Sequence, residues 1–149
     1  MSRVAVFCRV ILPLFLLLLS GCSTRFERDW QKAAMRPERD PFAGRWEGKW
    51  RSAKHRNGEG RLRCLLTPIA PERYQANFKA DWMIFTSSYS TVFEAQRKGR
   101  EITFRGSENL GPLFGGIYTF AGKATPERFS ATYDSSYDTG TFEMLRPGR

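Results

Sequence analysis

Apolar and polar residues alternate along most of the chain from residue 42 onward, which is the period-two pattern of strands with one buried face. Trp46, Gly48 and Trp50 alternate with charged residues, and the segments that begin at Tyr74 and Phe129 repeat this pattern. Turn signals such as Asn57-Gly58 and 138–140 separate the segments. The pattern predicts eight strands, near 44–52, 60–68, 73–82, 88–98, 101–107, 116–123, 128–134 and 139–146.

Two parts of this region resemble each other, which indicates an internal repeat. Residues 71–78 (PERYQANF) match residues 126–133 (PERFSATY) at an offset of 55. Further along the offset is 49, and it pairs Phe93, Glu94 and Arg97 with Phe142, Glu143 and Arg146. The change of offset places about six extra residues in the first copy, around 83–88. The repeat therefore predicts two similar four-stranded halves, over 44–98 and 99–149.

A four-stranded unit with one apolar face needs a second layer to cover that face. Two such units provide it as a closed, eight-stranded antiparallel up-and-down barrel, which also removes exposed strand edges. The predicted connections are short except at 82–88 and 107–115, as this topology requires. The prediction is thus an all-β barrel, with a β-sandwich of two sheets as the alternative.

A short helix near 25–35 is predicted before the first strand. Thr24 and Glu27 have the spacing of a capping box, and Phe26 and Trp30 lie one turn apart on the same helix face. The prolines at 37 and 41 prevent the helix from continuing. Such a helix would lie on a membrane surface, cover one end of the domain, or belong to a linker.

The first residues have the character of an export signal. Arg3 and Arg9 precede an apolar stretch, Val10–Leu19, that is too short to span a bilayer. The stretch ends in Leu19-Ser20-Gly21-Cys22, which resembles the lipobox of bacterial lipoproteins. The resemblance implies a cleaved signal peptide (1–21), acylation of Cys22 with chains such as palmitate, a tether (22–41) and a barrel domain (42–149). Ser23, in place of aspartate, favours the outer membrane, facing the periplasm, in a Gram-negative host.

The start of the barrel, Gly44-Arg45-Trp46, resembles the Gly-x-Trp motif of lipocalins and fatty-acid-binding proteins. This resemblance implies that Arg146 packs over Trp46 and that a ligand lies among aromatic side chains of the interior. The candidate ligand-binding residues are Trp50, Tyr74, Phe78, Phe104, Phe129, Tyr133 and Phe142. The other interpretation is that these rings simply fill the barrel. The chain is also similar in kind to small lipoprotein barrels that inhibit lysozyme, but it lacks their disulfides.

The charge of the chain is concentrated in one predicted hairpin. The net charge is +9, from 24 Lys+Arg and 15 Asp+Glu, and residues 45–63 hold seven bases against Glu47 and Glu59. The bases expected on the outer face are Arg45, Lys49, Arg51, Arg61 and Arg63. Because an exported, tethered protein rarely meets nucleic acid, an anionic membrane surface or envelope polymer is the expected counterpart. A solvated strand face is the alternative.

No group of residues indicates catalysis, a metal or a cofactor. Three Cys and one His are too few for most multi-ligand zinc sites. Cys64 is expected to pack inside the barrel, His55 to lie in a turn, and Glu94 and Glu143 to point outward. The sequence therefore favours a lipid-anchored envelope protein whose barrel binds a small apolar or lipid-like ligand. The alternative is an envelope interaction protein that uses the basic face to contact anionic components or a protein partner.

Overall fold

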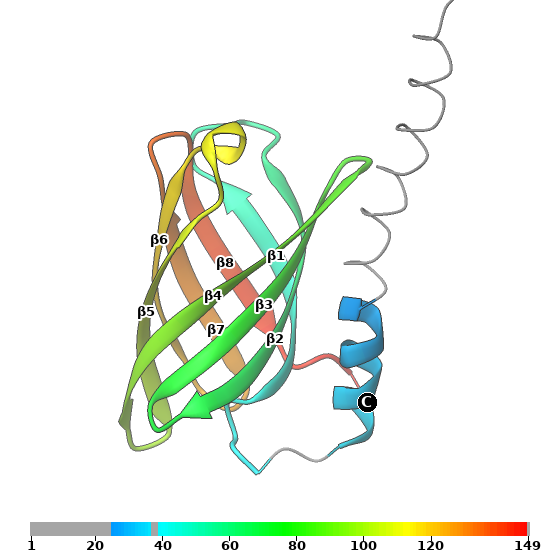
Figure 1. The fold of residues 1–149 in the computed structure, drawn as a ribbon, viewed down its shortest axis with the longest axis vertical. Coiled ribbons are helices and arrows are strands. Elements are labelled where there is room, and N and C mark those ends of the chain that lie inside the picture. Colours follow the sequence, from blue (N-terminus) through cyan, green and yellow to red (C-terminus); the bar gives the residue numbers. More distant parts are fainter. Residues whose placement is uncertain (1–24, 37–38, 149) are drawn as a thin grey trace, which may run out of the picture.

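The chain forms a closed eight-stranded barrel (Figure 1), described here by a computed structural model for residues 25–36 and 39–148. Each strand is antiparallel to its neighbours, and β8 pairs with β1 to close the wall. This confirms the barrel and excludes the sandwich. The strands are β1 (Gly44–Ser52), β2 (Glu59–Ala70), β3 (Arg73–Trp82), β4 (Phe85–Lys98), β5 (Glu101–Asn109), β6 (Ile117–Ala124), β7 (Arg128–Asp134) and β8 (Thr139–Leu145).

Predicted and observed strands agree within three residues, and β1, β3 and β7 agree at both ends. One short 3-10 helix, η1 (Pro112–Phe114), lies between β5 and β6. The lipobox residues 19–22, the expected N-cap Thr24 and Pro37 lie outside the described residues. Among the described residues no helix is long and apolar enough to cross a membrane.

The residues matched by the sequence repeat fall on strands that are four apart in the barrel. Residues 71–78 begin β3 and residues 126–133 begin β7, while Phe93 and its counterpart Phe142 lie on β4 and β8. The six extra residues of the first copy fall in the hairpin between β3 and β4. Pairing in this hairpin continues as far as Trp82 and Phe85. The hairpin projects beyond the rest of the wall (Figure 1).

Because the strands alternate in direction, the connections gather at two opposite ends of the barrel. The connections 52–59, 82–85, 109–117 and 134–139 lie at the end that we call the mouth (Figure 1, top). The connections 70–73, 98–101 and 124–128 lie at the other end, the base, together with residues 39–43 and 146–148.

The interior is filled by aromatic rings in three layers, from the base to the mouth. The first layer contains Trp46, Phe93, Phe104 and Phe129, with ring centroids as close as 4.6 Å. The second layer contains Phe78, Phe120 and Phe142, which are 4% exposed or less. The third, nearest the mouth, contains Tyr89, Tyr118 and Tyr133. Ring contacts connect each layer to the next, so the fold is held by one continuous core.

Arg146 closes the base over Trp46. Its guanidinium lies 3.8 Å from the centre of the indole ring, as the resemblance to lipocalins led us to expect. The repeat counterpart of Arg146 makes a similar contact, since the Arg97 guanidinium lies 4.8 Å from the centre of the Phe42 ring. Both halves of the barrel therefore use an arginine to cover an aromatic ring at the base.

The N-terminal helix (residues 25–35) packs against the outer wall of β1–β3 and not against an end of the barrel (Figure 1). Phe26 and Trp30, on one helix face, are 7% and 5% exposed. Glu27 accepts hydrogen bonds from Arg63 (2.7 Å and 3.0 Å) and from Lys79 (2.7 Å). The sequence assigned Glu27 only a capping role, whereas its carboxylate holds the helix to the barrel.

We predict that acid releases this helix. Hydrogen bonds from Arg63 and Lys79 lower the pKa of Glu27 from 4.5 to about 2. A carboxylate with a lowered pKa stabilises the folded state above its unfolded-state pKa, so docking should weaken as the pH falls from 4.5 toward 2. The loss is expected to be about 1–2 kcal/mol, because the Glu27 side chain keeps 40% of its exposure and solvent screens the ion pairs.

Acrylamide quenching of Trp30 fluorescence measures this release. The Glu27→Gln variant should expose Trp30 at neutral pH, and its quenching should no longer change below pH 4.5. Glu94→Gln removes an exposed partner of Arg73 and is the matched control. Equal protection of Trp30 in Glu27→Gln and in the unaltered protein would contradict the assignment.

Candidate functional site

The aromatic residues predicted to bind a ligand do not line one common cavity. Phe78, Phe104, Phe129 and Phe142 are buried against one another and against neighbouring rings. Tyr74 lies at the base, where its hydroxyl donates to Asp40 (2.7 Å). Only Trp50 and Tyr133 reach the mouth. These side chains thus form core packing over most of the barrel, and the space for a ligand must be sought elsewhere.

The predicted basic face is outward-facing but largely occupied. Arg63 is 8% exposed and bound to Glu27, and its pKa is raised by that hydrogen bond. Arg45 lies over the ring of Trp30. Arg61 pairs with Glu47 and Arg51 with Glu59, whereas Lys49 forms no ion pair among the described residues. Neighbouring acids and the helix therefore neutralise most of this charge.

Other residues considered for chemistry have structural environments. Cys64 is fully buried, and burial raises the pKa of its thiol well above the usual value, so the thiol is a poor nucleophile. His55 lies in the β1–β2 connection beside Tyr137 (ring centroids 5.6 Å apart). Glu94 pairs with Arg73, and Glu143 accepts from Ser130. Within the described residues no three metal-ligating side chains converge.

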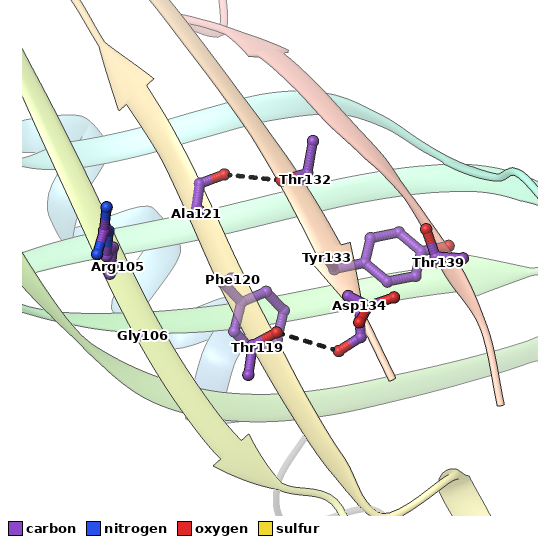
Figure 2. Close-up of a pocket in the computed structure, with 9 residues that line it drawn as sticks. All are labelled: Arg105, Gly106, Thr119, Phe120, Ala121, Thr132, Tyr133, Asp134 and Thr139. Carbon is purple, nitrogen blue, oxygen red and sulfur yellow. Dashed lines mark hydrogen bonds between the residues drawn. The ribbon is translucent and has the colours of Figure 1, made fainter. Parts of the chain in front are cut away.

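A recess of about 460 Å³ lies over the outer face of β5–β8 (Figure 2). Arg105 and Asp134 flank it, and threonine and alanine side chains form most of its floor. The Thr119 and Thr132 hydroxyls donate to backbone carbonyls of neighbouring strands (3.4 Å and 3.3 Å). The recess is open to solvent, and most of its lining surface is apolar.

A smaller recess of about 180 Å³ lies at the base, between the β2–β3 connection and residues Asp40 and Arg97. Asp40 already accepts hydrogen bonds from the Tyr74 hydroxyl, the Phe42 amide and the Arg97 guanidinium. Burial and the hydrogen bond to Asp40 raise the pKa of Tyr74. These polar groups bond to one another, and their hydrogen bonds stabilise the base.

The mouth is different, because polar groups that point inward there lack partners. Among the described residues, the hydroxyls of Tyr89 and Tyr118 make no hydrogen bond, and both side chains are only partly buried. Tyr133 donates to Asp138 (2.8 Å), whose other oxygen accepts from Ser52 (2.6 Å). Burial raises the pKa of Tyr89 well above its usual value, so its hydroxyl stays protonated and available as a donor.

Beside Tyr89 the backbone pairing of β4 with β5 ends before the strands reach the mouth. Their backbone pairing begins at Phe93 and Gly106 and extends only toward the base. Above that point residues 85–92 of β4 pair with β3 alone, and residues 107–109 of β5 pair with β6 alone. Gly106 stands at the point of separation, where a Cβ atom would lie 2.6 Å from the Phe93 ring. Beyond that point the Thr91 hydroxyl donates to the Ser107 carbonyl (3.4 Å), so a side-chain hydrogen bond joins β4 to β5 there.

Sequence analysis missed four of the residues that line this mouth: Tyr89, Glu108, Tyr118 and Asp138. Tyr118 and Phe120 are two residues apart and both face inward, so the alternating pattern of a strand was present in the sequence. Tyr89 stands among serines and threonines, which hide the alternation. The candidate functional site consists of six residues at the mouth: Trp50, Tyr89, Glu108, Tyr118, Tyr133 and Asp138.

Comparison of this chain with known protein families, curated proteins and solved structures found no match. The interpretation of the site consequently depends on its own geometry and chemistry.

Proposed function

We propose that this protein is a lipid-anchored protein of the cell envelope whose barrel binds a small neutral amphiphile at its mouth, without catalysis. Acylated Cys22 would hold it to the membrane, at the periplasmic side of the outer membrane in a Gram-negative host. The observation that carries the ligand proposal is a pair of tyrosine hydroxyls, of Tyr89 and Tyr118, that have no protein partner among the described residues and lie where the backbone pairing of β4 with β5 has ended.

The chemistry of the mouth suits a ligand with an apolar body and a small polar head. The faces of Trp50, Tyr89 and Tyr118 offer apolar contact, while the two hydroxyls offer hydrogen bonds that the protein itself leaves unmade. Glu108 pairs with Tyr118 across β5 and β6 on the same inward face and makes no ion pair among the described residues. Its carboxylate disfavours an anionic head, so a hydroxyl-bearing amphiphile is preferred over a fatty acid.

We predict that removing one hydroxyl weakens this binding. The neutral fluorophore N-phenyl-naphthylamine should bind the mature chain, and dodecanol should displace it more readily than dodecanoate. In Tyr89→Phe the affinity for dodecanol should fall about fivefold, because one hydrogen bond contributes about 1 kcal/mol. Fluorescence titration measures both affinities.

Tyr74→Phe is the matched control, because it removes a tyrosine hydroxyl at the opposite end of the barrel. It should bind dodecanol like the unaltered chain. If the fluorophore does not bind, or if dodecanol displaces it equally from Tyr89→Phe and the unaltered chain, the mouth is not the ligand site.

A further inference from the structure

Most of the large apolar side chains exposed on the barrel lie at the mouth, and the longest hairpin carries four of them. Met83 and Ile84, at the tip of the β3–β4 hairpin, are 83% and 90% exposed, and Trp82 and Phe85 flank them. Leu113 and Phe114 of η1, Ile117 and Tyr137 lie on the other connections at this end. Four consecutive large apolar side chains exposed at one projecting tip indicate that something covers them.

We infer that the β3–β4 tip, residues 82–85, inserts into the surface of the same bilayer that would hold the acylated Cys22. This inference rests on the lipid anchor of the proposed function, and it does not depend on the proposed ligand. The tip combines one tryptophan and one phenylalanine with two aliphatic side chains. This composition suits the boundary between head groups and acyl chains, where tryptophan is enriched.

The position of the N-terminal helix brings the anchor to the same side. The helix begins beside Lys79, whose ammonium group lies 5.9 Å from the Phe26 ring. Lys79 precedes the tip by three residues of β3, a rise of roughly 10 Å. Cys22 precedes the helix by three residues, which span at most roughly 10 Å. Figure 1 shows the helix and the projecting hairpin on the same side of the barrel. Anchor and tip can consequently reach one membrane surface.

Two bases at the mouth are placed to contact anionic lipid head groups, although acidic residues such as Asp81 and Glu108 lie at the same end. Lys54 and Arg56 are exposed in the β1–β2 connection at this end and form no ion pair among the described residues. Each base close to an anionic surface contributes about 1 kcal/mol to binding. With the tip inserted, the mouth would lie near the membrane, from which an amphiphile could reach Tyr89.

The test uses the mature chain with Cys22→Ala, which cannot be acylated, and vesicles of phosphatidylethanolamine with phosphatidylglycerol. Co-sedimentation measures binding, and brominated lipids report the depth of Trp82 by quenching. The unacylated chain should bind weakly with Trp82 quenched, and Ile84→Asp should reduce the binding at least tenfold. Because Ile84 is 90% exposed, this substitution does not disturb the fold.

Ile69→Asp is the matched control. Ile69 is 50% exposed near the end of β2 at the base, so its substitution should leave vesicle binding unchanged. Equal binding by Ile84→Asp and the parent chain, or self-association through the tip in place of vesicle binding, would overturn the inference. Acyl labelling of the Cys22-containing protein in cells tests the anchor separately: without label the anchor proposal fails, while insertion of the tip is still decided by the vesicles.

Discussion

Replacement of Phe78 by alanine should lower the free energy of unfolding by about 3–5 kcal/mol, the largest effect that we expect from a single substitution in this barrel. The Phe78 side chain has no solvent exposure. Its ring contacts Tyr89, Phe93, Phe120 and Phe142, with centroids 5.1–6.4 Å away. Alanine would leave a cavity where all three aromatic layers meet, and the rigid wall of a closed barrel cannot collapse to fill it.

Urea unfolding of the mature chain, followed by tryptophan fluorescence, measures this loss. Phe114→Ala removes the same ring from an exposed position and should change stability by less than about 0.5 kcal/mol. A domain of this size has a total stability of about 5–15 kcal/mol, so Phe78→Ala should unfold at a much lower urea concentration. If both variants unfold at the same urea concentration, the interior is not packed as described.

Replacement of Arg146 by methionine should cost about 2–4 kcal/mol, because it removes the closure of the base. The Arg146 guanidinium donates to the backbone carbonyls of Ala43 (2.8 Å), Arg45 (3.1 Å) and Pro126 (3.0 Å), and also to that of Pro41. Without it, these carbonyls lose a charged donor and the indole of Trp46 loses its cover. Methionine retains an apolar chain of similar length, so the loss reports the guanidinium itself.

Thermal unfolding of two further variants defines the cause. Arg146→Lys keeps the charge but not the planar set of donors, so it should recover only part of the stability. Arg128→Met removes an exposed arginine of β7 and should have little effect. Full recovery of stability by Arg146→Lys would show that charge alone, and not the fork of hydrogen bonds, closes the base.

The alternation of apolar and polar residues along the chain was sufficient to predict the strands. Side chains of a strand alternate between two faces, so a wall with one buried side leaves its period in the sequence. This is why β1, β3 and β7 could be predicted to the residue. The cover of Trp46 by Arg146 was also foreseeable, from the Gly-x-Trp resemblance at the first strand.

The candidate site was much less predictable. Alternation identified the inward-facing aromatic residues, but it does not show which of them pack together and which keep free polar atoms. Phe78 and Tyr89 are both inward-facing, yet the first is sealed in the core and the second lies where β4 leaves β5. The burial of Arg63 under the helix was missed for the same reason, since its partner Glu27 is 36 residues away.

The sequence by itself determined the local conformations: eight strands, one short helix and the faces that each strand buries. The tertiary structure decided between the predicted barrel and the alternative sandwich, because β1 pairs with β8. It alone decided that the helix docks on the outer wall and that the pairing of β4 with β5 ends before the mouth. The physical reason is the range of the interactions. Alternation reflects neighbouring peptide units, whereas closure, docking and the free hydroxyls of the mouth depend on residues that meet only when the barrel is complete.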